Sequence, residues 1–467
     1  MKKIIVALWV LMANASGSIA QQFVWEKTYN FFSGNSSIQG IDYSHDGGYV
    51  LLCGHGIGQT ANGVILFVNN MGDTLKTLSI TTAFWANYRS PIKKVDNGYV
   101  LAGTSFIQDT NRLQVIKLDK QGNIKWNNLY YSGRNETIPR DMLIISSNQY
   151  LVFSEALNAF VPGNINGSRL CIHKLDSLGN SSIFKVYTDL PIIKDDRNVN
   201  IIKKKHGEYL LFANQNLPGY ITPFFSRINS NLDTIKTKRV LYTGDSNNYY
   251  YSQRGNVIYS SDNSFVFTGY YQSNSPSQKQ AFVSKVDTNL NVQWTVLMQP
   301  TGLQSSRIVE LVGGEILLVA PINGGNQLYL HTISPKGQKI DSTILYSSIG
   351  NFKDVRHVLL QQNNTLIYAG QANNRAYLAK IDLNGFVTGI SPTETEISKV
   401  NSFIHFYPNP AKETLNYEST TTGDLLLQDA YGKIVKYLGT NWRGCYIRDR
   451  NWKRNLVPLY PIPIKLF

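Results

Sequence analysis

The sequence predicts an all-β protein made of seven similar sheets arranged in a ring. Two observations predict this class. A short strand-like segment recurs at nearly constant spacing along most of the chain, and each copy lies between turn residues that recur with it. The 467 residues are 42% apolar and 16% charged, which allows a buried core and excludes a disordered chain, a collagen-like rod or a coiled coil.

The recurring segment is a turn followed by an aromatic or aliphatic residue and a run of apolar residues. Successive copies are 50 to 59 residues apart, and their lead residues are Tyr49, Tyr99, Tyr150, Tyr209, Phe265, Ile316 and Leu366. A period of this length is typical of propellers and other repeat arrays. Internal repetition therefore accounts for most of the chain as one unit.

Each repeat predicts four short strands. A first strand precedes the recurring segment and is joined to it by a hairpin turn such as Asp46-Gly47 or Gly313-Gly314. A third strand ends in a second turn, and a fourth strand follows. A lone four-stranded sheet leaves both faces wet, whereas seven sheets packed face to face around an axis bury them. The sequence thus predicts a seven-bladed β-propeller of four-stranded antiparallel blades over residues 21–391. An open β-solenoid is the competing architecture.

One segment near the start predicts how the ring closes. Trp25 to Tyr29 resembles the fourth strand of a repeat, as Trp126 to Tyr130 shows by comparison, but no first three strands precede it. We expect it to supply the outer strand of the last blade. The alternative is an extension of the first blade.

The repeat pattern supports a family resemblance. A turn, then Gly-Tyr and two hydrophobic residues, then Lys-hydrophobic-Asp-x-x-Gly-x-x-x-Trp, resembles the kelch-like and quinoprotein-like propeller repeats common in exported bacterial proteins. The likeness covers Gln21 to about Ser391. It is specific for a blade and implies almost nothing about activity.

The first twenty residues predict export. Lys2 and Lys3 precede an apolar run, and small residues end it at Ala20, which is the pattern of a signal peptide over residues 1–20. The run is shorter than the ~20 apolar residues of a membrane-spanning helix, and we expect no transmembrane segment. The predicted location is the exterior, secreted or on the outer cell surface, after periplasmic transit.

The repeat ends at a polar, proline-initiated linker over residues 392–401, and a small β-sandwich-like domain is predicted over residues 402–467. Its opening resembles the C-terminal sorting domain of the type IX secretion system of Bacteroidetes-type bacteria. The resemblance implies the type IX machinery as a partner, and the matching residues are Tyr407, Pro408, Asn409, Pro410, Ala411, Asp429, Gly432 and Lys433.

The match to the sorting domain fails after about residue 435. Arg448 to Arg454 is basic, and Leu456 to Phe467 holds three prolines in a string that does not alternate. Such a segment pairs poorly in a sheet. Our hypothesis is a reading-frame shift in the gene downstream of Val435. A divergent but functional tail is the rival interpretation.

Charge and side-chain chemistry exclude several functions. Much of the net charge of +14 lies between Gly432 and Phe467, where eight basic residues face one acid. The remainder is too dilute to attract a polyanion, so we predict no nucleic-acid partner. Three distant cysteines and seven histidines without ligand spacing predict no metal and no cofactor. Cys53 and Cys171 suit core positions, although a disulfide between them stays open.

Aspartates at the second turn of several repeats admit two interpretations: capping of the turn, which is their ordinary role, or calcium binding. They are Asp119, Asp176, Asp287 and Asp382. No catalytic set is identifiable, because the arginines Arg89, Arg140, Arg227 and Arg307 are scattered along the chain and match no known cluster. The candidate ligand-binding residues are aromatic and crowd one repeat: Tyr249, Tyr250, Tyr251, Tyr270 and Tyr271.

These observations predict an exported, non-catalytic binding or interaction module, expected to be monomeric, whose propeller loops bind a glycan, a peptide or a protein. Packing between blades is the alternative role of the tyrosines. The alternative function is a secreted propeller enzyme, a glycoside hydrolase or lyase acting on polysaccharide. That function requires two or more buried ionisable groups converging around a water-sized gap at the central channel. A third possibility is a spacer in a surface layer.

Overall fold

The computed structural model divides the chain into two compact units, Met1–Ile390 and Ser391–Phe467. It describes residues 23–383 apart from short gaps, and beyond them the backbone of six short strands. The gaps are 32–34, 56–61, 81–83, 87–89, 108–109, 132–136, 158–166, 192, 195–198, 205–206, 218–219, 242–247, 252–254, 274–278, 304–305, 323 and 363. The signal-peptide segment and the linker lie outside the described residues. Within them, no helix is long and apolar enough to cross a membrane.

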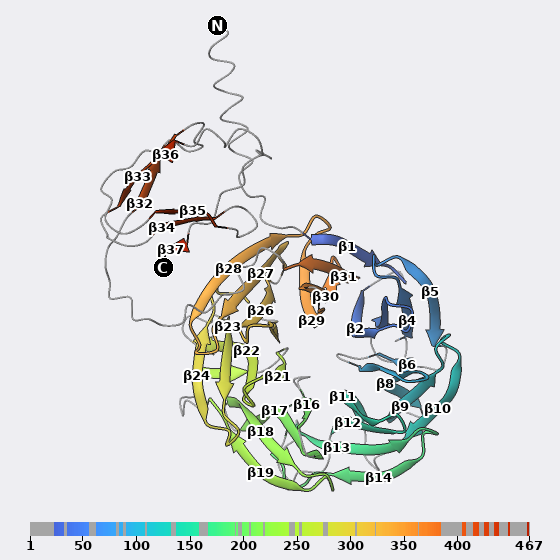
Figure 1. The fold of residues 1–467 in the computed structure, drawn as a ribbon. Helices are drawn as coiled ribbons and strands as arrows, with labels where there is room; N and C mark the ends of the chain where they lie inside the picture. The colour runs from blue at the N-terminus through green and yellow to red at the C-terminus, as the bar shows by residue number, and fades with distance from the viewer. Residues whose placement is uncertain are drawn as a thin grey trace. The chain divides into compact units, whose positions relative to one another are not determined.

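The first unit confirms the predicted fold class: seven blades of four antiparallel strands surround a central axis (Figure 1). The described residues of the chain contain strands and no α-helix. Blade 1 consists of β2 (Ser36–Tyr43), β3 (Tyr49–His55), β4 (Asn62–Val68) and β5 (Thr74–Ile80). Blade 2 consists of β7 (Ile92–Val95), β8 (Gly98–Ile107), β9 (Thr110–Leu118) and β10 (Ile124–Tyr130), with the short β6 (Phe84–Trp85) also paired to β8.

Blades 3 and 4 are joined into one sheet by a two-residue strand, β15 (Ile193–Lys194), which pairs with both. Blade 3 consists of β11 (Thr137–Ser146), β12 (Gln149–Leu157), β13 (Gly167–Asp176) and β14 (Ser181–Val186). Blade 4 consists of β16 (Asn200–Lys203), β17 (Tyr209–Leu217), β18 (Tyr220–Ile228) and β19 (Thr234–Arg239).

In blade 5 the inner strand has two parts, β20 (Asn248–Tyr251) and β21 (Val257–Tyr259), which both pair with the next strand. The blade continues with β22 (Phe265–Ser273), β23 (Lys279–Val286) and β24 (Val292–Leu297). Blade 6 consists of β25 (Arg307–Glu310), β26 (Ile316–Pro321), β27 (Gln327–Ile333) and β28 (Lys339–Tyr346).

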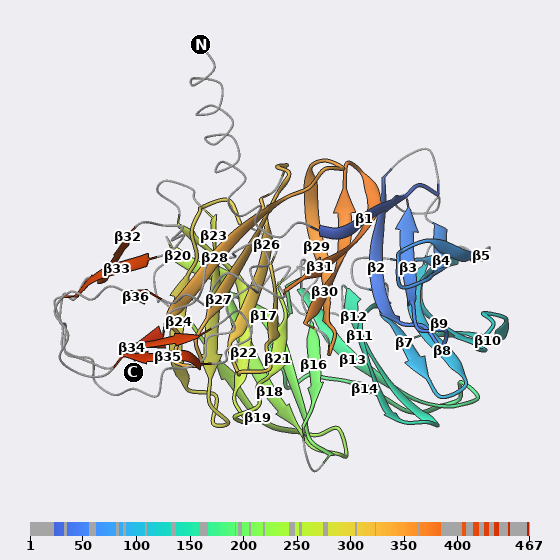
Figure 2. The same ribbon diagram turned by 45° about the horizontal axis from the view of Figure 1, so that its top comes forward.

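Blade 7 is built from both ends of the propeller sequence. Its inner strands are β29 (Phe352–Leu360), β30 (Thr365–Ala372) and β31 (Arg375–Asp382), and its outer strand is β1 (Phe23–Tyr29). Strand β1 runs antiparallel to β31, with Lys27 opposite Leu378. Figures 1 and 2 show the blue N-terminal strand lying against the orange blade. The prediction that Trp25 to Tyr29 closes the ring is confirmed.

The turns predicted between first and second strands adopt the expected backbone. Gly47 and Gly314 have φ values of 83° and 84°, and Asn263 takes φ 68° in the corresponding turn of blade 5. This left-handed region is open to glycine and tolerated by asparagine, which explains why those residue types recur there.

The core lies between the blades. The described apolar residues form one large cluster at each of the seven blade interfaces. Because side chains alternate along a strand, β3 sends Tyr49, Leu51 and Cys53 to the interface with blade 7, and Val50 and Leu52 to the interface with blade 2. Burial on both faces explains the continuous apolar runs that mark the repeats.

In the second unit, the structure describes the backbone of two three-stranded sheets. One contains β32 (Ile404–Tyr407), β33 (Thr414–Ser419) and β36 (Ile447–Arg448). The other contains β34 (Leu425–Gln428), β35 (Ile434–Leu438) and β37 (Lys465–Leu466). Both strands that follow residue 438 span two residues.

Candidate functional site

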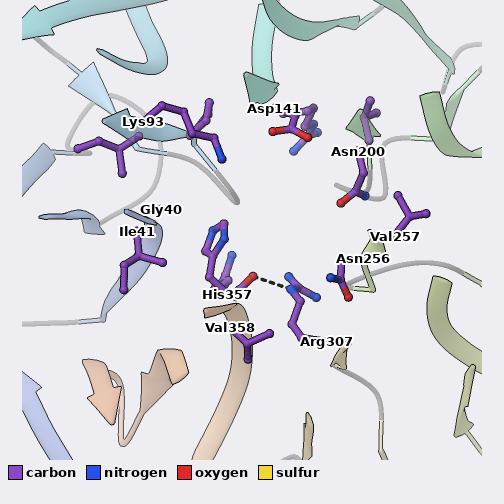
Figure 3. A pocket seen from close by; sticks show the side chains of 15 residues that line it. Gly40, Ile41, Lys93, Asp141, Asn200, Asn256, Val257, Arg307, His357 and Val358 are labelled. Atoms are coloured by element: carbon purple, nitrogen blue, oxygen red, sulfur yellow. Dashed lines mark hydrogen bonds between the residues drawn. The ribbon is translucent and has the colours of Figure 1, made fainter. Parts of the chain in front are cut away.

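A cavity of about 180 Å³ lies on the propeller axis and is lined by residues from all seven blades. The lining comes from the inner strands and the residues just before them. Polar side chains of six successive blades, from blade 2 to blade 7, surround the opening in Figure 3: Lys93, Asp141, Asn200, Asn256, Arg307 and His357. Apolar side chains complete the wall, among them Ile41, Val257 and Val358.

A constant sequence offset places these residues. In six of the seven repeats, the residue nine positions before the lead residue of the second strand lines the cavity: Gly40, Asp141, Asn200, Asn256, Arg307 and His357. This set was not predicted from the sequence, because its residue types differ from blade to blade. They can be found by aligning the repeats on their lead residues. The position nine residues earlier is then searched for polar residues instead of identical ones.

Three of the polar lining side chains are held by the inner strand of the following blade. Asp141 accepts a hydrogen bond from the Ile201 amide (3.0 Å), and Asn256 accepts one from the Ile308 amide (2.8 Å). Arg307 donates through Nε to the carbonyl of Arg356 at 2.6 Å. These bonds cross from blade to blade and hold the three side chains in place without a ligand.

At the join between blades 7 and 1, Nε2 of His357 lies 2.7 Å from the carbonyl oxygen of Gln39. A carbonyl oxygen only accepts hydrogen bonds, so this nitrogen carries the proton. The Gln39 side chain also takes part, since its Oε1 accepts a bond from Arg356 at 3.0 Å. The last and first blades therefore meet in a polar contact beside the cavity.

Three arginines of the lining are almost fully buried: Arg140 and Arg307 are 3% exposed and Arg356 is 5% exposed. Two of them form ion pairs with buried carboxylates that do not line the cavity. Arg140 pairs with Glu155 at 3.1 Å, and Arg356 pairs with Asp354 at 2.8 Å. Ion pairs of this kind offset the cost of removing charges from water.

The cavity wall carries more positive than negative charge. Its four basic side chains are Lys93, Arg140, Arg307 and Arg356, and its carboxylate is Asp141. With Glu155 and Asp354 counted behind the wall, the four bases face three acids. In a site partly screened from water, such an excess favours an anionic group.

The tyrosines selected from the sequence lie in blade 5, on β20 and β22. Tyr250 and Tyr271 come together, with ring centroids 5.0 Å apart, and both pack against the cluster between blades 4 and 5. Burial is the larger cause that raises the pKa of Tyr250. Tyr270 is 5% exposed, with the Lys279 ammonium 5.0 Å from its ring centroid. Tyr249 and Tyr251 pair with β22 through the backbone, and their side chains lie outside the described residues.

The repeated aspartates cap turns. Asp119, Asp176 and Asp287 each accept a 2.8 Å bond from the backbone amide four residues later. These backbone hydrogen bonds are the largest cause that lowers the pKa of Asp119 and Asp287, whereas for Asp176 the hydrogen bond from the Asn180 side chain is the largest cause. The capping interpretation is confirmed at these three positions. Cys53 and Cys171 are both buried and form no disulfide with each other.

Most of the sorting motif lies outside the described residues. Tyr407 is the last residue of β32, where its backbone pairs with Asn416. The remaining motif residues are not described: Pro408, Asn409, Pro410, Ala411, Asp429, Gly432 and Lys433.

Comparison with protein-family models and with curated proteins finds no match. Solved structures with a similar fold include the polysaccharide lyase Uly1, which is 11% identical, with a TM-score of 0.49 over 79% of this chain and 93% of that one. The WD40 domain of coronin from Toxoplasma gondii is 9% identical, with a TM-score of 0.44 over 78% and 87%. The α-L-arabinofuranosidase arb93a from Fusarium graminearum is 10% identical, with a TM-score of 0.43 over 63% and 92%. These matches carry no argument about function. The sheet topology of the chain itself defines its class, a seven-bladed β-propeller.

Proposed function

We propose that this protein is an exported, non-catalytic binding module that holds its ligand in the central channel. The observation that carries the proposal is the convergence of polar side chains from blades 2 to 7 on one cavity of about 180 Å³. Binding sites for small groups are concave and largely preformed, with a few placed polar groups among apolar ones. The bonds from blade to blade preform this wall.

The export part of the proposal rests on sequence features, the signal-peptide pattern of residues 1–20 and the sorting motif that begins at Tyr407. In this proposal the propeller faces the cell exterior, where glycans, peptides and proteins are the available ligands. In this proposal the propeller contains the binding site, and the second unit carries the sorting signal for export.

Binding of the purified full-length chain to an array of glycans and peptides tests the proposal. We expect a subset of ligands to bind the parent protein and to bind a Lys93→Gln/Asn200→Ala variant at least tenfold more weakly. Both side chains are partly exposed and line the cavity. Binding that is unchanged in this variant places the ligand elsewhere, and an array without any bound ligand contradicts the proposal.

A second candidate function is catalysis on a polysaccharide. The observation that favours it is the set of buried, converging ionisable groups around the channel, Arg140, Arg307 and Arg356. Arginine cannot act as a proton donor at ordinary pH. Among the described lining residues, His357 and Asp141 would therefore act as acid and base. Both carboxylate oxygens of Asp141 already accept backbone hydrogen bonds, and Nε2 of His357 bonds to a backbone carbonyl. Release of reducing ends or unsaturated sugars from the array, lost in His357→Gln, is the expected sign of an enzyme.

A further inference from the structure

We infer that the channel recognises one acidic sugar residue, a pyranose ring that carries a single carboxylate. This inference rests on the proposed function, because it assigns a ligand class to the same cavity. It follows from three features of the wall: its charge, the distribution of its hydrogen-bonding and apolar groups, and its size.

The charge of the wall fits a ligand with one negative charge. The four basic lining side chains and the three neighbouring carboxylates leave an excess of one positive charge. Lys93 and Arg307, from blades 2 and 6, both reach the opening in Figure 3. A carboxylate placed there gains charge-assisted hydrogen bonds, which are about twice as strong as neutral ones. A polyanion would bring more negative charge than this wall can balance.

Hydrogen-bond acceptors stand beside the cations. Asp141 and Asn200 lie on neighbouring blades 3 and 4, and both face the opening (Figure 3). Each oxygen of Asp141 accepts one backbone bond, from Met142 or from Ile201. Carboxylate and amide oxygens accept hydrogen bonds from hydroxyl groups, so both residues supply the acceptor chemistry that a sugar needs.

The apolar part of the wall suits the remaining surface of a sugar. Ile41, Val257 and Val358 present hydrocarbon to the same cavity. A pyranose ring has hydroxyl groups around its edge and C–H groups on its faces. The combination of cations, acceptors and aliphatic groups therefore matches an acidic sugar better than a simple inorganic anion, which offers no apolar face.

The size of the cavity limits the ligand to one unit. About 180 Å³ is available. One monosaccharide ring fills such a space. Cavities that enclose drug-sized ligands begin at about 300 Å³. The channel thus takes a single residue, at a chain end or a branch.

Titration calorimetry on the full-length protein tests the inference with four probes. They are methyl β-glucuronide, methyl β-glucoside, glucose 6-sulfate and N-acetylglutamate. We expect the glucuronide to bind at least tenfold more tightly than each of the other three, because only it combines one carboxylate with a sugar ring.

Substitutions of two lining residues and of one residue outside the lining test where the sugar binds. Lys93→Gln should weaken glucuronide binding at least tenfold and leave glucoside binding unchanged, whereas Asn200→Ala should weaken both. Lys94→Gln is the matched control, because its ammonium donates to the Ser44 carbonyl at 2.9 Å and is absent from the cavity lining. A Lys94→Gln variant that loses binding as strongly as Lys93→Gln overturns the assignment.

The outcomes separate this inference from the proposed function. Equal binding of glucuronide and glucoside, or tighter binding of the sulfate or of N-acetylglutamate, overturns the acidic-sugar assignment while a ligand-binding channel stands. A third outcome is that no sugar binds but another array ligand does, and that the Lys93→Gln/Asn200→Ala variant weakens its binding. This outcome also overturns the acidic-sugar assignment and leaves the ligand-binding channel standing. Failure of every probe and every array ligand defeats both.

Discussion

The hydroxyl group of Tyr29 donates a 2.7 Å hydrogen bond to the carbonyl oxygen of Gly72. Tyr29 ends the outer strand of blade 7, and Gly72 lies in the turn between the last two strands of blade 1. The same turn packs against Trp25, because a Cβ atom added to Gly72 would lie 2.9 Å from the indole ring. The two ends of the ring are thus joined by a bond and by a close contact that only glycine permits.

We expect Tyr29→Phe to lower the free energy of unfolding by about 1 kcal/mol, the usual net value of one hydrogen bond. Urea denaturation of the full-length chain measures it. Tyr187→Phe is the matched variant, because its hydroxyl makes the equivalent bond to the Leu232 carbonyl at 2.6 Å between blades 3 and 4. A loss in Tyr187→Phe without one in Tyr29→Phe indicates that β1 does not close the ring in solution.

Two buried histidines predict an acid-sensitive fold. Burial is the largest cause that lowers the pKa of His173 and of His331, each to about 4. In the unfolded chain both return to about 6.5. The unfolded state therefore binds more protons between these values, so stability falls as the pH drops from about 6.5 to about 4. Each histidine contributes up to about 3 kcal/mol to this loss.

Unfolding by urea at neutral pH and near pH 4.5 measures the effect. His173 packs against Phe184 with ring centroids 4.6 Å apart, so His173→Phe preserves an aromatic contact and removes the proton site. We expect this variant to lose less stability than the parent between the two pH values. An identical loss in both proteins refutes the assignment to His173.

The fold was predictable from the sequence because its core repeats. Central strands buried on both faces must be apolar along their length, so Tyr49, Tyr99 and Tyr150 mark successive blades without any knowledge of the partners they touch. Strand β1 was predictable for a similar reason, since Trp25 and Trp126 occupy the same position in their blades.

The site was not predictable in the same way, because the repeat fixes a position and not a residue type. Asp141 and Arg307 are equivalent in the ring, yet one is an acid and the other a base. Every blade contributes residues to a shared wall, and only the closed ring brings their side chains together. The crowded tyrosines were easier to notice, but Tyr250 and Tyr271 lie against the core between two blades.

The two buried cysteines predict inert thiols. Burial raises the pKa of Cys53, and a thiolate is the reactive form. In a Cys445→Ser variant, which leaves Cys53 and Cys171 as the thiols of the chain, we expect no reaction with a thiol reagent under native conditions. Both should react in denaturant. Fast reaction of the native protein contradicts the burial of these two strands.

The gene offers a test of the altered tail. If a reading-frame shift lies downstream of the codon for Val435, translation of a neighbouring frame should give alternating strands. The resemblance to the sorting domain also implies a Gly-hydrophobic-Tyr strand near the end. Resequencing the source gene and translating all three frames measures this. A neighbouring frame without alternating strands contradicts the hypothesis and leaves a divergent tail.

The Arg140–Glu155 pair predicts a coupled effect on the channel wall. Glu155 is fully buried and accepts bonds from Arg140 at 3.1 Å and from Ser168 at 3.3 Å. Arg140→Met removes the compensating charge of a buried carboxylate, so we expect a loss of about 3–5 kcal/mol in the free energy of unfolding. Arg140→Met/Glu155→Leu removes both charges and should recover most of it. Urea unfolding of the two single variants and the double variant gives the coupling energy. If the double variant is as unstable as the sum of the single variants, the two side chains act independently, and the pair does not hold this part of the cavity wall.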